Sequence, residues 1–556
     1  MPPVTGHAAV QLGQPSPWRR GAPLIAIAFA ACWHATKYDF ICDDAFIALR
    51  YAQNLIEHRE LAYNLGQRVE GFTSPLWVLL VSAAGSLGLP LPAATQWLGV
   101  GAALLTFWAL CRFWDELEPE APQLVLAPAV ALAISAPFAA WTLGGLETPL
   151  FVALFTLTLS SIARDARERE FRSSVKAGLS AGLCALCRPE GATLIAIGSV
   201  VLGFTWAAPA PRRPRLLGWF APIALLVGGY ELFRLRYYGA PLPNTFYVKT
   251  SGDGLWQRGL NYLALAGAEF GWLLVGAGLL SVSGLLLTGF RLPAEQRRHS
   301  NQVLMLCTSA AALIHGLYVA RIGGDFLDLY RFLTPLLPAA YCIVTGASSR
   351  LFAVLAGQRR FAVPLLATAS FVGHARNQFV MAREATQVAS SSRAALRLEP
   401  LGWTRLYGRR WQGIGKWLAR ARTEGDSTAV GAAGALPFYA GLPNLDLFGL
   451  NDLEIARHGR IIGNRPGHQR FATMDYLLAQ QPTFIFMNPE STPLAPGRLR
   501  YDRYWTARGY LPLEIRVDRE LCDCAEPFYH QFLVRRERAA SLRGRDDVVV
   551  GNLSPP

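Results

Sequence analysis

The sequence predicts a polytopic α-helical membrane protein with a water-soluble α/β domain at its C-terminal end. Its 556 residues are 52% hydrophobic and only 17% charged, whereas roughly a quarter of a soluble protein is charged. Long Leu, Ala, Val and Phe runs fill residues 21–372, and ordinary soluble sequence follows. We therefore expect an N-terminal cytoplasmic segment (1–22), a membrane domain (23–373) and a soluble domain (374–556).

Basic residues between the apolar runs predict the orientation of the helices. Besides Arg19 and Arg20, four clusters stand out, namely "RDARERE" (164–170), "PRRPR" (211–215), "RLPAEQRRH" (291–299) and "QRR" (358–360). The positive-inside rule places all of them in the cytoplasm. Membrane topology thus explains much of the net charge of +14, and we expect no nucleic-acid partner.

Counting crossings between the clusters gives about eleven transmembrane helices. The first, residues 23–36, is short for a span, and no signal-cleavage site follows it, so we expect it to be retained. Later spans are expected near residues 150–163, 216–236, 262–290, 302–320, 332–348 and 361–373, with two more around "CRPEG". Three apolar stretches near 75–88, 92–111 and 122–140 leave room for only two full crossings, so one should be re-entrant or interfacial.

Every motif-like polar stretch falls on the outer face in this topology. These stretches are the loop of Asp43 and Asp44, "VEGFTSPLW" (69–77), "WTLGGLETPL" (141–150), "CRPEG" (187–191), "PLPNTFYVK" (241–249) and "GGDFLDLYRF" (323–332). Ionisable groups that converge at one membrane face indicate a functional site. A transporter would instead place polar residues near the bilayer centre, commonly within internal repeats, and no clear repeat is visible.

Two adjacent acids follow the first apolar helix, in "YDFICDDAFIALRYAQNLI" (38–56). Neighbouring carboxylates are costly to desolvate, so the position of Asp43 and Asp44 beside a bilayer indicates that they have a specific role. One of them could be a general base, while the other raises its pKa or holds a metal ion. Alternatively, one acid is only the N-cap of an amphipathic helix over 45–56 that lies along the membrane interface.

Residues 43–77, "DDAFIALRYAQNLIEHRELAYNLGQRVEGFTSPLW", resemble the terminal arabinofuranosyltransferase (AftB) family of the GT-C class. Shorter similar blocks are "GLETPLF", "RPEG", "PNTFY" and "LDLFGLNDLEIAR" (445–457). The resemblance implies a GT-C-like fold, a polyprenyl-phosphate sugar donor and a catalytic first outer loop (37–74). The resemblance to this family does not account for Cys522, Cys524 or the net charge.

The resemblance implies inverting transfer of one sugar, best matched by arabinofuranose, to an outer-face cell-envelope glycan or glycolipid. Asp43 or Asp44 would be the general base, and the sequence does not separate them. The site and the C-terminal domain would face the periplasm of a bacterial inner membrane. The alternative is a non-catalytic lipid-linked-sugar transporter or envelope-assembly protein with a glycan-binding tail.

Further polar residues in the outer stretches are candidates for substrate binding. A leaving phosphate beside hydrocarbon needs cationic donors, which Arg188, Lys249, Arg321 and Arg331 could provide. Candidates for holding the sugar or orienting the site are Glu70, Glu147, Glu190, Asn244 and Asp325. Each also has a structural alternative as a helix cap, turn acid, ion pair or interfacial anchor. No cofactor is certain; Mg, Mn or Ca at Asp43 and Asp44 is the one we consider.

The sequence of the soluble domain predicts a small α/β unit. "STAVGAAGALPFYAG" (427–441) and "PTFIFM" (482–487) look like strands, with a helix at 474–480 between them. "GAAG" lacks the full dinucleotide-binding spacing, so we prefer glycan binding, with Tyr439, Asn451, Asp452 and Arg457 as candidates or plain turn residues. Cys522 and Cys524 could be oxidised, although pairing across one residue is geometrically strained.

Overall fold

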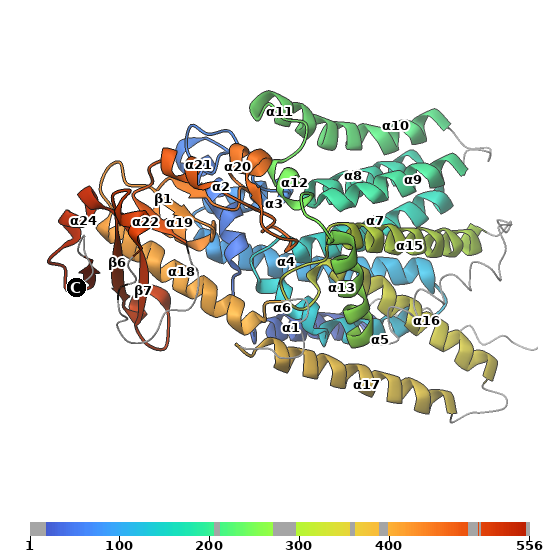
Figure 1. Ribbon diagram of the computed structural model, residues 1–556. Helices are drawn as coiled ribbons and strands as arrows, with labels where there is room; N and C mark the ends of the chain where they lie inside the picture. The colour runs from blue at the N-terminus through green and yellow to red at the C-terminus, as the bar shows by residue number, and fades with distance from the viewer. Residues whose placement is uncertain are drawn as a thin grey trace, which may run out of the picture.

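The computed structural model describes residues 18–204, 212–270, 296–355, 362–388, 398–487, 499 and 502–551. Long helices lie side by side on the right of Figure 1, and a domain with a β-sheet lies at their left end. The chain therefore has the two parts that the sequence predicts.

Five helical segments are long and apolar enough to cross a membrane, counted over the described residues alone. They are α4 (Leu91–Leu117), α7 (Thr148–Glu168), Arg213–Tyr237, Asn301–Arg321 and Arg331–Ser349. A bent pair, Pro122–Ala133 with Ala136–Leu143, would make a sixth. The chain is a multi-pass membrane protein, and the expected eleven spans are not confirmed. Residues 271–290, part of one expected span, lie outside the described residues.

The remaining helices of the bundle have the following bounds. They are α1 (Trp18–Ala35), α2 (Asp43–His58), α3 (Pro75–Ser86), α5 (Leu126–Ala133), α6 (Ala136–Leu143), α8 (Phe171–Cys187), α9 (Ala192–Phe204), α10 (Arg212–Ile223), α11 (Gly229–Tyr237), α12 (Asn244–Lys249), α13 (Leu255–Phe270), α15 (Gln296–Arg321), α16 (Leu337–Leu355) and α17 (Ala362–Ala385). Short turns η1, η2, η4 and η5 cover Pro122–Val125, Pro189–Gly191, Ala224–Gly228 and Arg331–Leu336.

The three apolar stretches between residues 75 and 143 take three different forms. Only α4 is a straight candidate span, whereas α3 has 12 residues. The third stretch bends by 67° between α5 and α6. Pro137 lies in the first turn of α6, where it needs no hydrogen-bond donor, and Gln378 accepts the amide of Ala136 at 2.9 Å. The break therefore has partners inside the bundle.

Over its described residues, the C-terminal domain is built on a six-stranded mixed sheet with the order β2-β1-β5-β7-β6-β8. The strands are β1 (Thr428–Val430), β2 (Asn444–Asp446), β5 (Phe484–Phe486), β6 (Tyr510–Val517), β7 (Phe528–Arg535) and β8 (Val548–Val550). β1 pairs in parallel with β2 and β5, and the other pairings are antiparallel. The predicted α/β character is confirmed.

Helices of this domain pack around the sheet. They are α18 (Leu401–Ala421), α19 (Ala435–Ala440), α20 (Leu453–His458), α21 (Met474–Ala479), α22 (Arg503–Thr506), α23 (Arg519–Cys522) and α24 (Arg536–Leu542). A separate hairpin consists of β3 (Arg460–Ile461) and β4 (Arg470–Phe471). The predicted strand over 427–441 ends at Val430, and α19 follows it.

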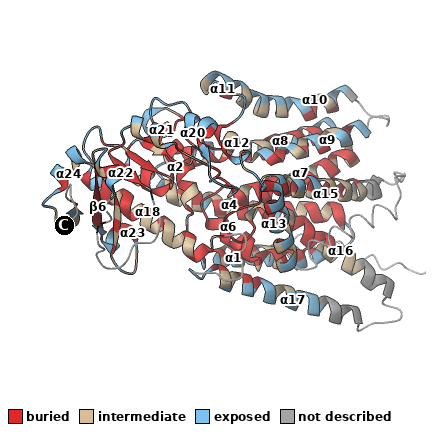
Figure 2. Ribbon diagram, in the orientation of Figure 1, coloured by how far each residue is buried: buried red, intermediate tan, exposed pale blue. Residues whose placement is uncertain are grey.

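Helix α2 is covered by protein along its apolar side, whereas the sequence pattern also allowed contact with lipid at the membrane interface. Figure 2 shows it largely buried between the bundle and the C-terminal domain. Nine of its side chains are buried, from Ala45 to Asn54, and it packs against α3, α18 and α19. Apolar side chains that the sequence pattern assigned to lipid are covered by the soluble domain.

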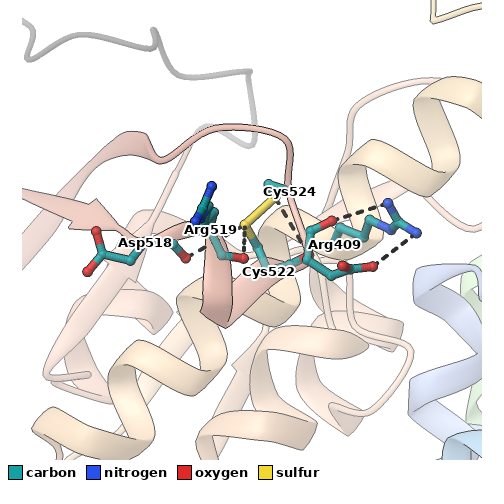
Figure 3. Close-up of a disulfide and its surroundings, with 6 residues drawn as sticks. Arg409, Asp518, Arg519, Cys522 and Cys524 are labelled. Atoms are coloured by element: carbon teal, nitrogen blue, oxygen red, sulfur yellow. Dashed lines mark hydrogen bonds and ion pairs between the residues drawn. A yellow bond between two sulfur atoms is a disulfide. The ribbon is translucent and has the colours of Figure 1, made fainter.

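A disulfide joins Cys522 and Cys524 at the end of α23, as Figure 3 shows. Arg409, on α18, lies beside it and forms an ion pair with Asp523 at 3.2 Å. The same guanidinium pairs with Asp39 at 3.0 Å. The turn of the disulfide is thus linked to the chain just before the two adjacent acids.

Candidate active site

The segment 37–74, called the first loop below, is built into the C-terminal domain. Arg50 of α2 is 6% exposed and has no carboxylate partner in the described residues. Its Nε donates to the carbonyl of Tyr63 at 2.8 Å, and its Nη2 to that of Leu442 at 2.7 Å. Its Nη1 donates to the carbonyl of Pro437. One buried guanidinium therefore ties α2 to its own loop, to α19 and to the turn after α19.

Further hydrogen bonds join the first loop to the same part of the domain. The hydroxyl of Tyr63 donates to the carbonyl of Ala433 at 2.6 Å. The side chain of Asn64 exchanges two hydrogen bonds with the backbone of Asn444, of 2.9 and 3.0 Å. Residues 433–451 therefore contact the first loop along one side. The position of the two acids in this loop thus depends on the C-terminal domain.

Asp43 is held by the C-terminal domain, at the start of α19. Its Oδ1 accepts the amide of Ala435 at 2.8 Å, and its Oδ2 accepts the amide of Gly434 at 3.2 Å. Burial raises the pKa of Asp43 to about 7, although these two amides oppose the shift. The N-cap of α2 is Cys42, with no side-chain capping bond. Asp43 thus caps α19 rather than its own helix.

Asp44 is half-buried, and no hydrogen bond reaches its carboxylate from any described residue. Its strongest electrostatic partners are the cations Arg331 and Lys249. Burial raises its pKa, and the two cations only partly offset this effect. An unpaired carboxylate with a raised pKa, facing cations, has the properties of a general base.

Arg331 and Asp325 form a two-point ion pair beside Asp44. The Nε of Arg331 donates to Oδ2 of Asp325 at 2.5 Å, and its Nη2 donates to Oδ1 at 3.2 Å. Asp325 also accepts the amide of Phe326 at 2.8 Å. The pair fixes the guanidinium, and Nη1 of Arg331 has no hydrogen bond within the described ranges.

Arg188 brings two of the predicted motifs together. Its Nε donates to Glu190 at 2.5 Å and its Nη1 to Glu147 at 2.7 Å. The ring of Phe332 lies between two cations, with its centroid 4.8 Å from Cζ of Arg188 and 5.1 Å from Cζ of Arg331. Both guanidiniums are therefore held rigidly at one place.

Lys249 lies at the end of α12. Together with Arg188 and Arg331 it forms what we call the cationic group. Its strongest electrostatic partners are Asp44, Arg331 and Arg188. Desolvation lowers the pKa of Lys249, and Asp44 opposes this shift. Asn244, at the start of the same helix, donates to the carbonyls of Gly449, Leu450 and Asp452 at 2.9 to 3.1 Å. Asn244 thus attaches α12 to the C-terminal domain.

Glu70 and Arg321 lie differently from the expected arrangement. Both oxygens of Glu70 are used, by Arg234 at 2.6 Å and by the hydroxyl of Tyr230 at 2.7 Å. The described contacts do not join Glu70 to either acid of the pair. Arg321 ends α15 with an exposed side chain, and no ion pair joins it to the cationic group in the described part of the chain.

Two polar residues of the site were not predicted. Glu399 and Arg465 form an ion pair with each other, and both interact electrostatically with Asp44. The sequence "GNRPGHQR" (463–470) has the glycines and proline of a turn. Nothing in it indicates that the turn reaches the membrane domain.

The surroundings of Asp43 and Asp44, as far as the structure describes them, do not suit the divalent metal ion considered from the sequence. Within the described residues, no group of three or more His, Cys, Asp or Glu side chains is placed to hold a metal ion. Asp43 binds backbone amides of α19, whereas Asp44 faces cations. This arrangement does not fit a divalent cation, and we derive no chemical step through one.

Comparisons with known proteins agree with the resemblance read from the sequence. Two curated proteins are named terminal β-(1→2)-arabinofuranosyltransferase. The protein of Mycobacterium tuberculosis is 27% identical over 340 residues, which is 56% of this chain and 53% of the relative. That of Corynebacterium glutamicum is 29% identical over 339 residues, covering 55% and 48%. The resemblance is confirmed, and the chain spans about half the length of these relatives.

The whole fold is similar to a solved structure. The crystal structure of ArnT from Cupriavidus metallidurans in the apo state has a TM-score of 0.51 and 14% identity, covering 94% of this chain and 99% of that one. This similarity shows a GT-C fold and no more. Residues 401–532 match a family described as a domain of unknown function (DUF8728).

Proposed function

We propose that this protein is a membrane glycosyltransferase that moves a single sugar, best matched by arabinofuranose, from a polyprenyl-phosphate donor to a cell-envelope glycan. The observation that carries the proposal is the carboxylate of Asp44, which has no hydrogen-bond partner among the described residues and interacts electrostatically with Lys249 and Arg331. The names of the two curated relatives support the sugar and the linkage. By that linkage, the attacking group is a 2-hydroxyl of a glycan.

Asp44 acts as the general base. Its carboxylate removes the proton of the acceptor hydroxyl while the oxygen forms a bond to the anomeric carbon. The bond between that carbon and the phosphate oxygen breaks, and polyprenyl phosphate leaves with the electron pair. Attack and departure on opposite faces of the sugar invert the anomeric centre. A raised pKa suits Asp44 to this step because a base works best near the operating pH.

Lys249, Arg331 and Arg188 stabilise the leaving phosphate. Its charge rises as the glycosidic bond breaks, and preformed cationic donors bind this charge more tightly in the transition state than before it. Glu147, Glu190 and Asp325 hold the two guanidiniums in place. Replacement of any of the three cations by Ala should therefore weaken binding of polyprenyl phosphate without unfolding the protein. Arg321→Ala tests the fourth predicted cation in the same assay.

The site would lie on the periplasmic face of a bacterial inner membrane, at the height of the lipid headgroups. The positive-inside rule supports this orientation. A cysteine placed at the exposed Glu424, in a background without reactive native cysteines, should be labelled in intact cells by an impermeant reagent. Labelling only after lysis would contradict the orientation.

A transfer assay tests the activity itself. Full-length protein in nanodiscs would receive synthetic polyprenyl-phosphate arabinofuranose and an arabinofuranose oligosaccharide, and mass spectrometry would follow the products. We expect one pentose to be added and polyprenyl phosphate to be released in equal amount. Release of free sugar alone, or no turnover, would contradict the proposal. The alternative of a transporter predicts movement of the donor across the membrane without a new glycosidic bond.

A further inference from the structure

The β3–β4 hairpin of the C-terminal domain reaches the end of α12. The side chain of Gln469 donates to the carbonyl of Lys249 at 3.1 Å, and Nε of Arg470 donates to the hydroxyl of Ser251 at 3.0 Å. The hairpin turn, residues 462–469, is thereby fixed beside Lys249. Figure 1 shows the neighbouring α20 next to α12 in the same view.

Arg465 of this turn and Glu399 are held firmly where they meet. Glu399 exchanges backbone hydrogen bonds with the loop after α15, to Phe326 at 2.8 Å and from Asp328 at 3.1 Å. The guanidinium of Arg465 pairs with Glu399 and lies 4.9 Å from the ring centroid of Phe326. The pair therefore joins two parts of the chain that are also part of the candidate active site.

This ion pair still has unused hydrogen-bonding capacity. The side chain of Glu399 is 23% exposed and that of Arg465 is 37% exposed. Nε of Arg465 is buried without a hydrogen-bond partner, and Oε2 of Glu399 has none in the described ranges. Desolvation lowers the pKa of the adjacent His468 to about 3, so its imidazole is neutral. Partly exposed side chains with an acceptor and donors therefore lie side by side.

Asp44 interacts electrostatically both with this pair and with the cationic group. The strongest electrostatic partners of Lys249 are Asp44, Arg331, Arg188 and Glu147. Those of Glu399 are Arg465, Asp44 and Asp325. Displacement with inversion requires the attacking hydroxyl and the leaving phosphate to lie on opposite faces of the transferred sugar. Glu399 and Arg465 interact with the base and are not among the three cations assigned to the phosphate, so they are placed to bind the acceptor.

We propose that Glu399 and Arg465 form an acceptor subsite that binds adjacent hydroxyl groups of a neutral glycan and so directs its reacting hydroxyl to Asp44. The carboxylate accepts hydrogen bonds from hydroxyl groups, and the guanidinium donates to their oxygens. The pair has no net charge, so it offers no preference for an anionic acceptor. This inference rests on the proposed function in naming Asp44 as the base.

Separate binding measurements test the subsite. Full-length protein in nanodiscs would be titrated with a neutral arabinofuranose tetrasaccharide and, independently, with polyprenyl phosphate. Glu399→Gln and Arg465→Gln should each weaken tetrasaccharide binding about ten- to a hundredfold, because each removes a charged hydrogen-bond partner. Binding of polyprenyl phosphate should change less than about twofold, and in turnover the KM for the acceptor should rise more than kcat falls.

Arg460→Gln is the matched control, because Arg460 is exposed on the same hairpin and has no ion pair in the described part of the chain. It should bind both ligands as the wild type does. Unchanged tetrasaccharide binding in the Glu399 and Arg465 variants would overturn the subsite, as would equal loss of both ligands or failure of the wild type to bind the tetrasaccharide. Normal binding by a wild type that transfers no sugar would instead refute the proposed function and leave the subsite standing.

Discussion

Asp43 accepts the backbone amide of Ala435 at 2.8 Å, from a residue 392 positions further along the chain. The amide of Gly434 binds the other oxygen of the same carboxylate. The glycine-containing turn before α19 therefore holds a side chain of the first loop, and two of its amides already donate to that carboxylate. This contact gives the two adjacent acids different tasks, since Asp43 attaches the loop and Asp44 has no hydrogen-bond partner in the part of the chain that the structure describes.

Gly434→Ala should disrupt this attachment. A Cβ atom at residue 434 would overlap the carbonyl oxygen of Asp43, so the loop or the turn must move. We expect a loss of about 1–3 kcal/mol in stability and a clear fall in turnover, measured by thermal unfolding and the transfer assay. Gly463→Ala is the control, because a Cβ there meets no atom within 4 Å. Equal behaviour of both variants would argue against the attachment.

The titration of Asp43 makes stability depend on pH. Its pKa in the folded protein, about 7, lies above the usual aspartate value of 3.8. Between these values the folded state retains a proton that the unfolded state has released, so stability falls as pH rises through this window. Asp43→Asn does not titrate. Its melting temperature relative to the wild type should therefore rise between about pH 5 and pH 8, and a constant difference would speak against the shift.

Arg50 should be needed for stable packing of α2 against the C-terminal domain. Arg50→Met removes one hydrogen-bond donor from each of three carbonyl oxygens and leaves those of Tyr63 and Pro437 with their second donors, Asn54 and Gly441. We expect a loss of about 3 kcal/mol. Arg59→Met removes the same charge from an exposed position of the first loop and should be nearly neutral. Denaturant unfolding of both variants in the same detergent measures the difference. Similar midpoints would contradict the role of Arg50.

Local sequence predicted the parts of the site that belong to the membrane domain. The segments containing Asp44, Arg188, Lys249 and Arg331 were recognisable because each is a short polar stretch between apolar runs. Topology placed them at one end of the bundle, and the structure brings these residues together. Which polar group binds which was not predictable, because Glu70 and Asn244 have the same local appearance but serve structural contacts.

Contacts with the C-terminal domain could not be read from local patterns. The apolar side of α2 fits either lipid or protein, and only its packing against α18 and α19 decides between them. The partners of Asp43 and Glu399 likewise come from distant segments. The bend between α5 and α6 depends in part on Gln378, more than two hundred residues away. The local indication of an irregular segment was that three apolar stretches lie where the topology allows only two full crossings.

Lys249 should set the alkaline limit of turnover. Activity needs an ionised Asp44, whose pKa is raised, and a protonated Lys249, whose pKa is lowered. The rate should therefore rise with pH through the pKa of Asp44 and fall as pH passes that of Lys249, giving a bell-shaped profile. In Lys249→Arg the alkaline limb should disappear, because a guanidinium stays protonated. An unchanged alkaline limb would assign it to another group.

The single-turnover rate of Asp44→Asn, compared with that of Asp43→Asn, tests whether Asp44 is the base. Asn has nearly the size of Asp and cannot accept the proton of the acceptor hydroxyl. With both substrates saturating, Asp44→Asn should lose about 10²- to 10⁴-fold in rate and still bind polyprenyl phosphate. Asp43→Asn should keep most of its rate, because its amide oxygen can still accept a backbone hydrogen bond. Near-normal turnover by Asp44→Asn would contradict the assignment.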